Sequence, residues 1–559
     1  MGGAALLAQT PSVTQVGNAG NYGTNVAQGS IFVVIGTNLG PAALIQASSF
    51  PLATTLSGTS VRLTPAGGGA PVDAFPVYTV ARQVAAILPS NAAPGNYNLT
   101  VSFNGATSAP VSVPVVQRSY GMVTLNSRGT GTAVLQNASD GLRVNQFIAP
   151  VRPGQVLVLW GTGLGPVRVP DNAAPGAQDL RGDVEIRVLV GGVEVTPVYA
   201  GRSPDLPGAD QINFAVPDNA PTGCTVPLAV RVGNQTSPAA SIAIAPAGRA
   251  VCEHPFLSEA SLRQIDNNGD AVYGGFAISA FSFQVAITGL PIPLPPIDVR
   301  AETAGGAFQR ISRANFDEVT TELAPPIGGC VVTPGQLNSS GQRIDRPVTG
   351  LDAGGLTLSG PNVANRAFDR LPGNGYSLSL AAPSTTGASA AVIAAGTYTL
   401  AGAGGADVGP FNAQVRVSGA LNWTNRDAIT QVTRANPLTI NWSGAAAEDL
   451  VVIQGLAGRQ SGGTAASPNY DGALFACYAR GSANTFTVPP SILQQLPQAD
   501  GISITGLTPN LSSIGLLIVS SANANEANGR FTAPLRAGGN IDFGFLGYAF
   551  GGAKTLNYR

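Results

Sequence analysis

Apolar and polar residues alternate over short stretches of this chain, and turn residues separate the stretches. Residues 184–199 contain two alternating runs around a Gly-Gly pair, and residues 99–115 contain two around Asn104-Gly105. Period-two alternation around two-residue turns predicts antiparallel strands joined by hairpins. Such units recur at short spacing along the chain, which predicts an all-β fold built of β-sandwich domains.

One pattern of segments occurs twice in the first half of the chain. The matching pairs, in the same order in both copies, are 30–41 with 155–166, 76–78 with 197–199, and 89–95 with 217–223. In the first pair an apolar run leads into Gly-Thr-Asn-Leu-Gly or Gly-Thr-Gly-Leu-Gly. Because order and spacing are kept, the sequence predicts a duplicated domain of about a hundred residues.

Composition agrees with several packed domains and argues against two classes of partner. The 559 residues are 44% hydrophobic and 11% charged, with 71 glycines and 43 prolines, so turn-dense β structure explains the chain better than disorder. The net charge is −1 and no Lys/Arg run occurs, which excludes a phosphate-binding footprint and makes nucleic acid an unexpected partner. Since no long apolar run exists, we expect no transmembrane segment.

The N-terminal residues suggest export. Residues 1–8 are a small apolar run ending in Ala8, and a polar segment follows. The run resembles the end of a secretory signal peptide, although it lacks a basic segment before it. A frayed N-terminus is the alternative.

Four cysteines are present, and none belongs to a Cys-x-x-Cys pair. An even count in an exported protein suggests two disulfides, and we expect Cys224–Cys252 and Cys330–Cys477. Buried free thiols are the alternative. His254 is the single histidine, so the sequence offers no multi-histidine metal site.

The duplicated segments resemble the TIG/IPT class of immunoglobulin-like (Ig-like) domains, in which a Gly-rich turn follows an apolar strand. Residues 119–246 are more specifically similar to the Solibacter uncharacterised C-terminal domain family. The matching stretches are 124–126, 129–133, 153–154, 161–165, 198–202, 210–213 and 221–225. The first copy keeps Gln83 but lacks the Asp-Gln-Ile-Asn stretch and any cysteine. The resemblance implies a bacterial, exported protein with an Ig-like fold, and it supplies no catalytic residues.

The expected organisation is therefore a string of tandem Ig-like β-sandwich domains followed by further β structure, since the chain is too long for one core. The expected segments are a signal remnant (1–8), a lead-in (9–27), Ig-like domain 1 (28–117), Ig-like domain 2 (118–247), a linker (248–257), β-rich domain 3 (258–418) and β-sandwich-like domain 4 (419–559).

One short segment has oxygen-bearing side chains at alternate positions, as calcium-binding loops do. Asp266, Asn268 and Asp270 are the candidate ligands. The glycine of this segment is at the fourth position instead of the sixth, and Ala277 stands where a bidentate glutamate is needed. An ordinary Asn-Gly turn is the alternative, and no other cofactor is expected.

Tryptophan is the side chain best suited to stack on sugars, and the chain has three. Trp160 ends an apolar run and Trp442 alternates with Ile440, so core packing explains both. Trp423, in Asn-Trp-Thr-Asn-Arg, is the candidate for an exposed ligand-binding side chain.

These observations favour a secreted or cell-surface protein without enzymatic activity, which binds a polysaccharide or a surface protein or spaces other parts. One alternative is an extracellular polysaccharide- or protein-degrading hydrolase with its site in residues 258–559. Another is a structural subunit of an extracellular assembly, built by pairing of edge strands.

Overall fold

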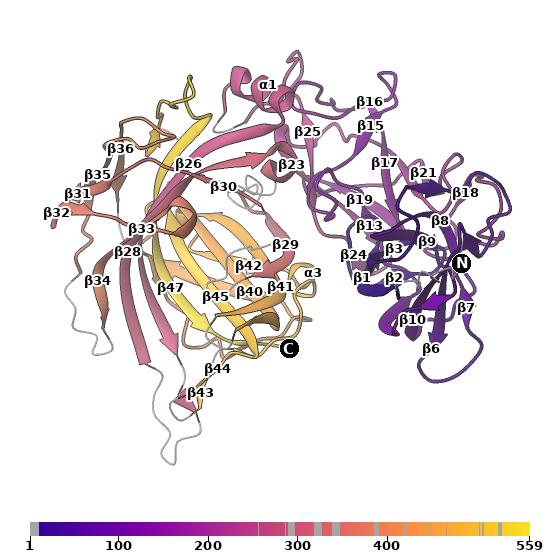
Figure 1. Cartoon of the computed structure of the whole chain (residues 1–559). Coiled ribbons are helices and arrows are strands. Elements are labelled where there is room, and N and C mark those ends of the chain that lie inside the picture. The colour runs from indigo at the N-terminus through magenta and orange to yellow at the C-terminus, as the bar shows by residue number, and fades with distance from the viewer. Residues whose placement is uncertain are drawn as a thin grey trace, which may run out of the picture. The chain divides into compact units, whose positions relative to one another are not determined.

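The computed structural model describes residues 10–559, apart from 255–256, 286, 289–296, 318–326, 338–346, 385–390, 419–420, 448, 465–466, 502, 506–507 and 524–527. The expected signal remnant, residues 1–8, lies outside the described residues. The chain forms two compact units, one ending at Cys252 and one running from Glu253 to Arg559 (Figure 1). Strands dominate both units, so the predicted all-β fold class is confirmed.

The first repeat is a sandwich of two sheets. One sheet has the order β1 (Ser12–Asn18), β3 (Ile31–Thr37), β9 (Gln83–Ile87), β8 (Phe75–Val80) and β4 (Ile45–Gln46). The other has the order β2 (Val26–Ala27), β12 (Val111–Val116), β10 (Gly95–Phe103), β6 (Thr59–Pro65) and β5 (Thr55–Leu56), with β7 (Val72–Asp73) on β6 and β11 (Ala106–Thr107) on β10. The lead-in is thus part of the fold, because β1 pairs with β3.

The second repeat is also a sandwich of two sheets. One has the order β16 (Arg143–Val144), β15 (Leu135–Asn137), β17 (Val156–Thr162), β22 (Asp210–Ala215), β21 (Tyr199–Arg202) and β18 (Gln178–Asp179), with β13 (Gly121–Met122) on β17. The other has the order β14 (Gly131–Thr132), β25 (Ala240–Ile244), β23 (Gly223–Val232), β19 (Ile186–Val190) and β20 (Val193–Val195), with β24 (Gln235–Thr236) on β23.

The two sandwiches share one topology, as the duplicated sequence predicts. The order β3-β9-β8 corresponds to β17-β22-β21, and β2-β12-β10-β6 corresponds to β14-β25-β23-β19. In both copies the first pair of the second sheet is parallel. Gly95 and Gly223 open the equivalent strands with φ of +154° and +155°, a backbone region that side chains disfavour, which explains a glycine at this position of each copy.

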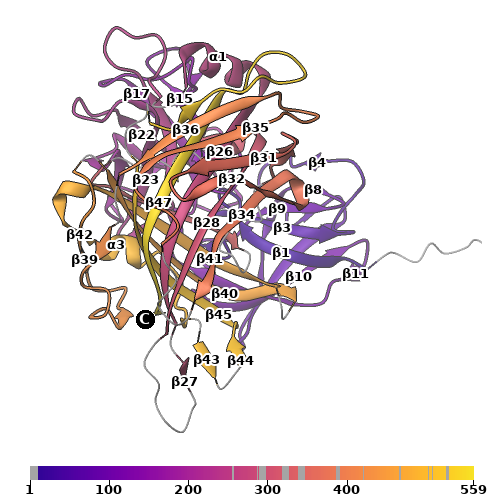
Figure 2. The same ribbon diagram turned by 90° about the vertical axis from the view of Figure 1, so that its left-hand side faces the viewer.

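The second unit is built on one sheet of eleven strands (Figure 2). The order is β29 (Cys330–Leu337), β41 (Ser467–Arg480), β40 (Leu450–Thr464), β45 (Ser513–Ala522), β47 (Phe543–Thr555), β26 (Asp270–Val285), β28 (Ile297–Ser312), β34 (Gly375–Ser384) and β33 (Asp369–Leu371), with β30 (Thr349–Leu351) on β28 and β46 (Arg530–Phe531) on β47.

Two smaller sheets cover this large sheet, and each closes a separate apolar core against it. The first covering sheet has the order β32 (Val363–Ala367), β31 (Leu356–Gly360), β35 (Gly396–Gly402) and β36 (Phe411–Val417). The second has the order β37 (Asn422–Trp423), β39 (Leu438–Ser443) and β42 (Thr485–Val488). Other elements of the unit that the structure describes include β27 (Ile287–Thr288), β43 (Ser503–Thr505), β44 (Thr508–Asn510), β38 (Gln431–Val432), β48 (Asn557–Tyr558), α1 (Glu259–Asn268), α3 (Pro490–Leu493) and the 3₁₀ turns η1 (Pro372–Asn374) and η2 (Gly481–Ala483).

Both covering sheets lie on the same face of the large sheet. Phe550 of β47 belongs to the first core and Val519 of β45 to the second. Val519 is paired with Gly552, which is two residues from Phe550 and therefore points to the same side. We call this covered side the inner face.

The expected division of this unit into domains 258–418 and 419–559 is wrong, because the large sheet contains strands from both segments. β26 pairs in parallel with β47 from Tyr273 and Phe543 to Gln284 and Lys554. Pairing over such a sequence distance leaves no local signal in the chain. Residue 418 instead separates the two covering sheets.

α1 lies where the expected linker ends. Ser258 caps α1 by accepting a hydrogen bond from the Ser261 N–H, and the left-handed Gly269 ends it. In the described part of the chain, no helix has both the length and the apolar character needed to cross a membrane.

Candidate functional site

Two adjoining pockets open on the inner face between the two covering sheets. The smaller has a volume of about 240 Å³ and the larger about 360 Å³. Ser282, Leu421 and Gly551 line both, so the pockets form one continuous groove. We call this hollow the groove.

The floor of the larger pocket consists of small residues on two adjacent strands. Ser282 of β26 is paired with Gly552 of β47, and Ala280 is paired with Phe550. A Cβ atom at Gly552 would lie 3.5 Å from the Ser282 Oγ atom and 3.6 Å from Trp423 Cε3, which is ordinary contact. The groove therefore exists because the floor carries a hydroxymethyl group and a hydrogen atom where larger side chains would fill the space.

One wall depends on a buried carboxylate. The Glu302 side chain is 1% exposed, and its Oε2 atom accepts hydrogen bonds from the Val392 N–H (2.8 Å) and the Ile393 N–H (2.9 Å). Its Oε1 atom accepts from the Nε (3.0 Å) and Nη2 (2.7 Å) atoms of Arg300. Glu302 thus holds both the backbone that lines the smaller pocket and the guanidinium beside it.

The opposite wall is the turn that follows β37. The Asn425 Oδ1 atom accepts hydrogen bonds from Trp423 Nε1 (3.0 Å) and from the Asn441 N–H (2.9 Å). The next residue, Arg426, donates from Nη1 to Ser282 Oγ at 3.0 Å. The turn therefore has a fixed shape and places the guanidinium of Arg426 over the floor.

Two further polar side chains continue this wall. Gln284 Nε2 donates to the Asp427 Oδ1 atom at 3.2 Å, and Lys554 Nζ donates to the Arg426 carbonyl oxygen at 3.1 Å. The groove thus offers hydroxyl, guanidinium and carboxylate groups beside small residues, which suits a polar ligand of modest size.

Trp423 lies at this groove, but the expectation that it is exposed is wrong. The residue is 6% exposed and belongs to the second core of the unit. It still lines the larger pocket, and its Cε3 atom would lie 3.6 Å from a Cβ atom at Gly552. Its role in ligand binding stays a prediction. Arg300, Ser282 and Gly552 were missed, since only tertiary pairing places them here.

The three candidate calcium ligands lie at the end of α1 and the start of β26, not in a loop. Asp266 forms an ion pair with Arg313 (2.7 Å) and Asp270 forms one with Arg310 (2.6 Å). Asn268 is the last residue of the helix. The described residues contain no group of three or more His, Cys, Asp or Glu side chains placed to hold a metal. Calcium binding here stays a prediction that this arrangement does not favour.

Both expected disulfides are present in the structure. Cys224 of β23 is bonded to Cys252, which ties the end of the first unit to the second repeat. Cys330 is bonded to Cys477, its register partner across the β29–β41 pair.

His254 packs near Phe316, with ring centroids 6.2 Å apart. Burial, together with the charges of Arg530 and Arg313, lowers the pKa of His254 from 6.5 to about 3. Below about pH 6.5 the histidine binds a proton in the unfolded chain but stays neutral in the folded chain. The free energy of unfolding therefore falls as the pH decreases from 6.5 toward 3.

We expect this histidine to contribute a loss of up to about 2 kcal/mol in the free energy of unfolding between pH 7 and pH 5. Urea unfolding at both pH values, with His254→Gln as the comparison, measures it. The variant should lose less stability than the wild type over this interval, and equal losses would contradict the assignment.

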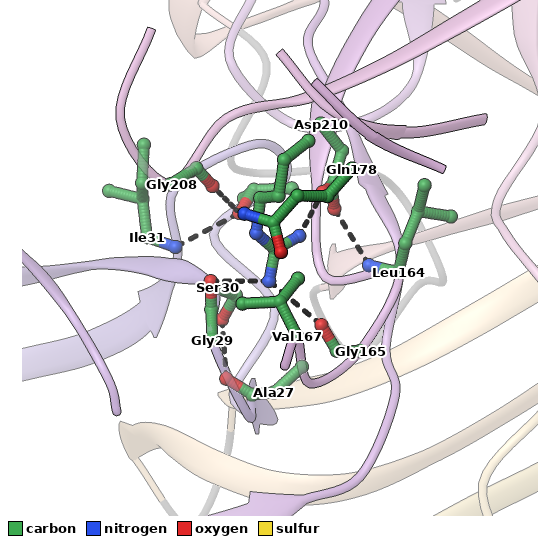
Figure 3. Close-up of polar contacts among 12 residues, drawn as sticks. Ala27, Gly29, Ser30, Ile31, Leu164, Gly165, Val167, Gln178, Gly208 and Asp210 are labelled. Carbon is green, nitrogen blue, oxygen red and sulfur yellow. Dashed lines mark hydrogen bonds and ion pairs between the residues drawn. The ribbon is translucent and has the colours of Figure 1, made fainter. Parts of the chain in front are cut away.

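In the first unit a buried ion pair lies where the two Ig-like repeats meet (Figure 3). The side chains of Arg202 and Asp210 are 6% and 0% exposed, and Arg202 Nη1 bonds to Asp210 Oδ1. Arg202 Nη2 donates to the carbonyl oxygens of Gly29 (2.6 Å), in the first repeat, and Gly165 (2.7 Å), in the second. One guanidinium therefore joins both repeats.

Further hydrogen bonds surround this ion pair. Thr162 Oγ1 accepts from the Ile31 N–H at 2.9 Å and donates to the Gly208 carbonyl at 3.1 Å. The Asp171 carboxylate accepts from the Ser90 N–H (2.6 Å) and hydroxyl (2.8 Å). Hydrogen bonds from both repeats therefore converge at this junction.

Comparisons with known proteins give no family assignment. No protein-family model matches the sequence, and no curated protein matches it. The TIG/IPT and Solibacter resemblances therefore stay predictions, and the Ig-like character of the repeats depends on their own strand topology.

Several solved structures show a weak similarity. Latent PorU from Porphyromonas gingivalis is 11% identical over 72% of this chain and 31% of its own, with a TM-score of 0.17. Domains 4–9 of the surface layer protein SbsC are 12% identical over 96% of this chain and 83% of their own, with a TM-score of 0.15. SGBP-B from Bacteroides ovatus, solved with a mixed-linkage heptasaccharide, is 11% identical over 78% of this chain and 93% of its own, with a TM-score of 0.13. At these scores the whole folds do not coincide.

Proposed function

We propose that this protein is an exported, non-enzymatic polysaccharide-binding protein. The unit from Glu253 to Arg559 binds a saccharide in the groove, and the two Ig-like repeats act as a rigid spacer. The observation that carries the proposal is the groove itself, in which polar groups converge on a floor of small residues between two closed cores.

The lining of the groove suits sugar hydroxyl groups. Ser282 both donates and accepts hydrogen bonds, Arg426 donates, and Asp427 accepts. The side chain of Asp427 is 81% exposed and so is accessible to a ligand. Trp423, which also lines the larger pocket, adds an aromatic side chain.

The acids near the groove do not favour hydrolysis. Asp427 is the single carboxylate among the described residues that line the two pockets. Most glycosidases need a pair of carboxylates flanking the scissile bond. Glu302 is close by, but its two oxygens are engaged by Arg300 and two backbone N–H groups. This supports binding without turnover.

Two other features support the remaining parts of the proposal. Disulfides persist in oxidising compartments, and the bonds Cys224–Cys252 and Cys330–Cys477 therefore support export. The buried Arg202–Asp210 pair supports a spacer role, since a tandem pair of repeats that cannot bend at its junction keeps a fixed length.

Gly552→Leu in the full chain tests the proposal. A leucine side chain at this position enters the larger pocket, whereas Gly552→Ala adds only a Cβ atom in ordinary contact. Against the glycans that the wild type binds on a polysaccharide array, we expect Gly552→Leu to lower the affinity by about tenfold or more and Gly552→Ala by less than about twofold.

Thermal unfolding of both variants provides the control for folding. Binding that survives Gly552→Leu would place the ligand elsewhere, and an array on which the wild type binds no glycan would reject the proposal. Release of reducing ends from a bound polymer would favour the hydrolase alternative.

A further inference from the structure

Two guanidinium groups flank a single hydroxyl group on the floor of the groove. Arg300 lines the smaller pocket, Arg426 the larger, and Ser282 both. We infer that the ligand is an acidic polysaccharide, whose uronate carboxylate groups bind between Arg300 and Arg426. This inference rests on the proposed function and names the class of its ligand.

Strand register places Arg300 next to Ser282. The two residues are directly paired across the antiparallel strands β28 and β26, so their side chains lie on the same face. Arg426 reaches Ser282 from the opposite wall, with Nη1 3.0 Å from Oγ. The three side chains therefore form a row, guanidinium, hydroxyl, guanidinium, across the floor.

Arg300 is held in place without being buried. Its Nε and Nη2 atoms are bound to Glu302 Oε1, while its side chain remains 47% exposed. Among the described residues, its Nη1 atom has no hydrogen-bond partner. A guanidinium fixed on one edge and open on the other loses little conformational entropy when it binds an anion.

The local charges favour an anion. Arg300, Arg426 and Lys554, the one lysine of the sequence, face the carboxylates of Glu302 and Asp427 among the described side chains here. Glu302 is 1% exposed and points away from the ligand toward two backbone N–H groups. Two guanidinium groups, those of Arg300 and Arg426, and one carboxylate, that of Asp427, which is 3.5 Å from Arg426 Nε, therefore line the groove.

A carboxylate-bearing sugar matches these groups better than a neutral sugar. The planar guanidinium presents parallel N–H donors that fit a carboxylate, and charged hydrogen bonds are stronger than neutral ones. Ser282 lies between the two arginines and can bond a ring hydroxyl of the same residue. A neutral sugar would offer the open edge of Arg300 only uncharged acceptors, which form weaker hydrogen bonds than a carboxylate does.

The experiment uses the full chain and an array of uronate oligosaccharides, each printed beside its carboxyl-reduced, neutral counterpart. Arg300→Gln and Arg426→Gln remove the charges and keep side chains of similar length. Arg370→Gln is the matched control, because Arg370 is 48% exposed and paired with Asp352 in the same unit but does not line the groove. For the uronate that binds most tightly and for its neutral counterpart, titration calorimetry then measures the affinity at low and at high salt.

We expect each uronate that binds to bind at least about tenfold more tightly than its neutral counterpart, with weaker binding at high salt. Arg300→Gln and Arg426→Gln should each remove most of this preference, and Arg370→Gln should leave it unchanged. Equal affinity for both members of a pair, or binding to neutral glycans only, would overturn the inference and leave the proposed function standing. An array on which nothing binds would reject both.

Discussion

Arg202→Ala is expected to destabilise the first unit by about 3–5 kcal/mol, because it leaves the Asp210 carboxylate buried without a counter-ion. It also removes the two hydrogen bonds by which the guanidinium joins Gly29 and Gly165. Scanning calorimetry of the full chain should show the transition of this unit at lower temperature, and hydrogen exchange should show earlier opening of strands β3 and β17.

Arg62→Ala is the matched control for this variant. Arg62 forms an ion pair with Asp73 in the same unit, but the two side chains are 56% and 38% exposed, so we expect a far smaller loss than for Arg202→Ala. The double variant Arg202→Met, Asp210→Asn removes both charges and keeps an acceptor for the Leu164 N–H. It should be more stable than Arg202→Ala. If Arg202→Ala costs no more than Arg62→Ala, the buried pair does not hold the repeats together.

Removal of the Cys330–Cys477 disulfide is expected to lower the free energy of unfolding by about 5 kcal/mol, because this bond closes a loop with a sequence separation of 147 residues. The double variant Cys330→Ala, Cys477→Ala therefore raises the conformational entropy of the unfolded chain. It also leaves a cavity at the buried position of Cys477. Urea unfolding followed by intrinsic tryptophan fluorescence measures the loss, since Trp423 and Trp442 lie in the same core.

The Cys224–Cys252 disulfide provides the comparison. Its sequence separation is 28 residues, for which the same argument gives about 3.6 kcal/mol in the first unit. The variant Cys224→Ala, Cys252→Ala should therefore be the less destabilised of the two. A larger loss for this pair would show that strain or packing, and not chain entropy, decides the contribution of these bonds.

The groove and the junction between the repeats differ in how far their polar side chains are exposed. At the junction the side chains of Arg202 and Asp210 are buried and bonded to each other and to backbone groups of both repeats, which favours a single arrangement. The groove leaves Asp427 and one edge of Arg300 accessible.

The sequence predicts the features that depend on local pattern. Alternation in residues 184–190 predicts β19, and Asn104-Gly105 predicts the turn between β10 and β11, because side-chain period and turn geometry are properties of neighbouring residues. The matching segments 30–41 and 155–166 predict the duplicated sandwich for the same reason. The sequence also names Trp423 as a candidate ligand-binding side chain; it lies at the groove, but it is buried and not exposed as predicted.

The groove itself is decided only in the tertiary structure. Ser282 and Gly552 are far apart in the chain and meet because β26 and β47 pair in parallel, and Arg300 joins them through the register of β28. The same pairing merges residues 258–418 and 419–559 into one sheet. Sequence alone determines strands and turns, which are local, but the partner of each strand is chosen by the free energy of closing both cores at once. No stretch of neighbouring residues records that choice.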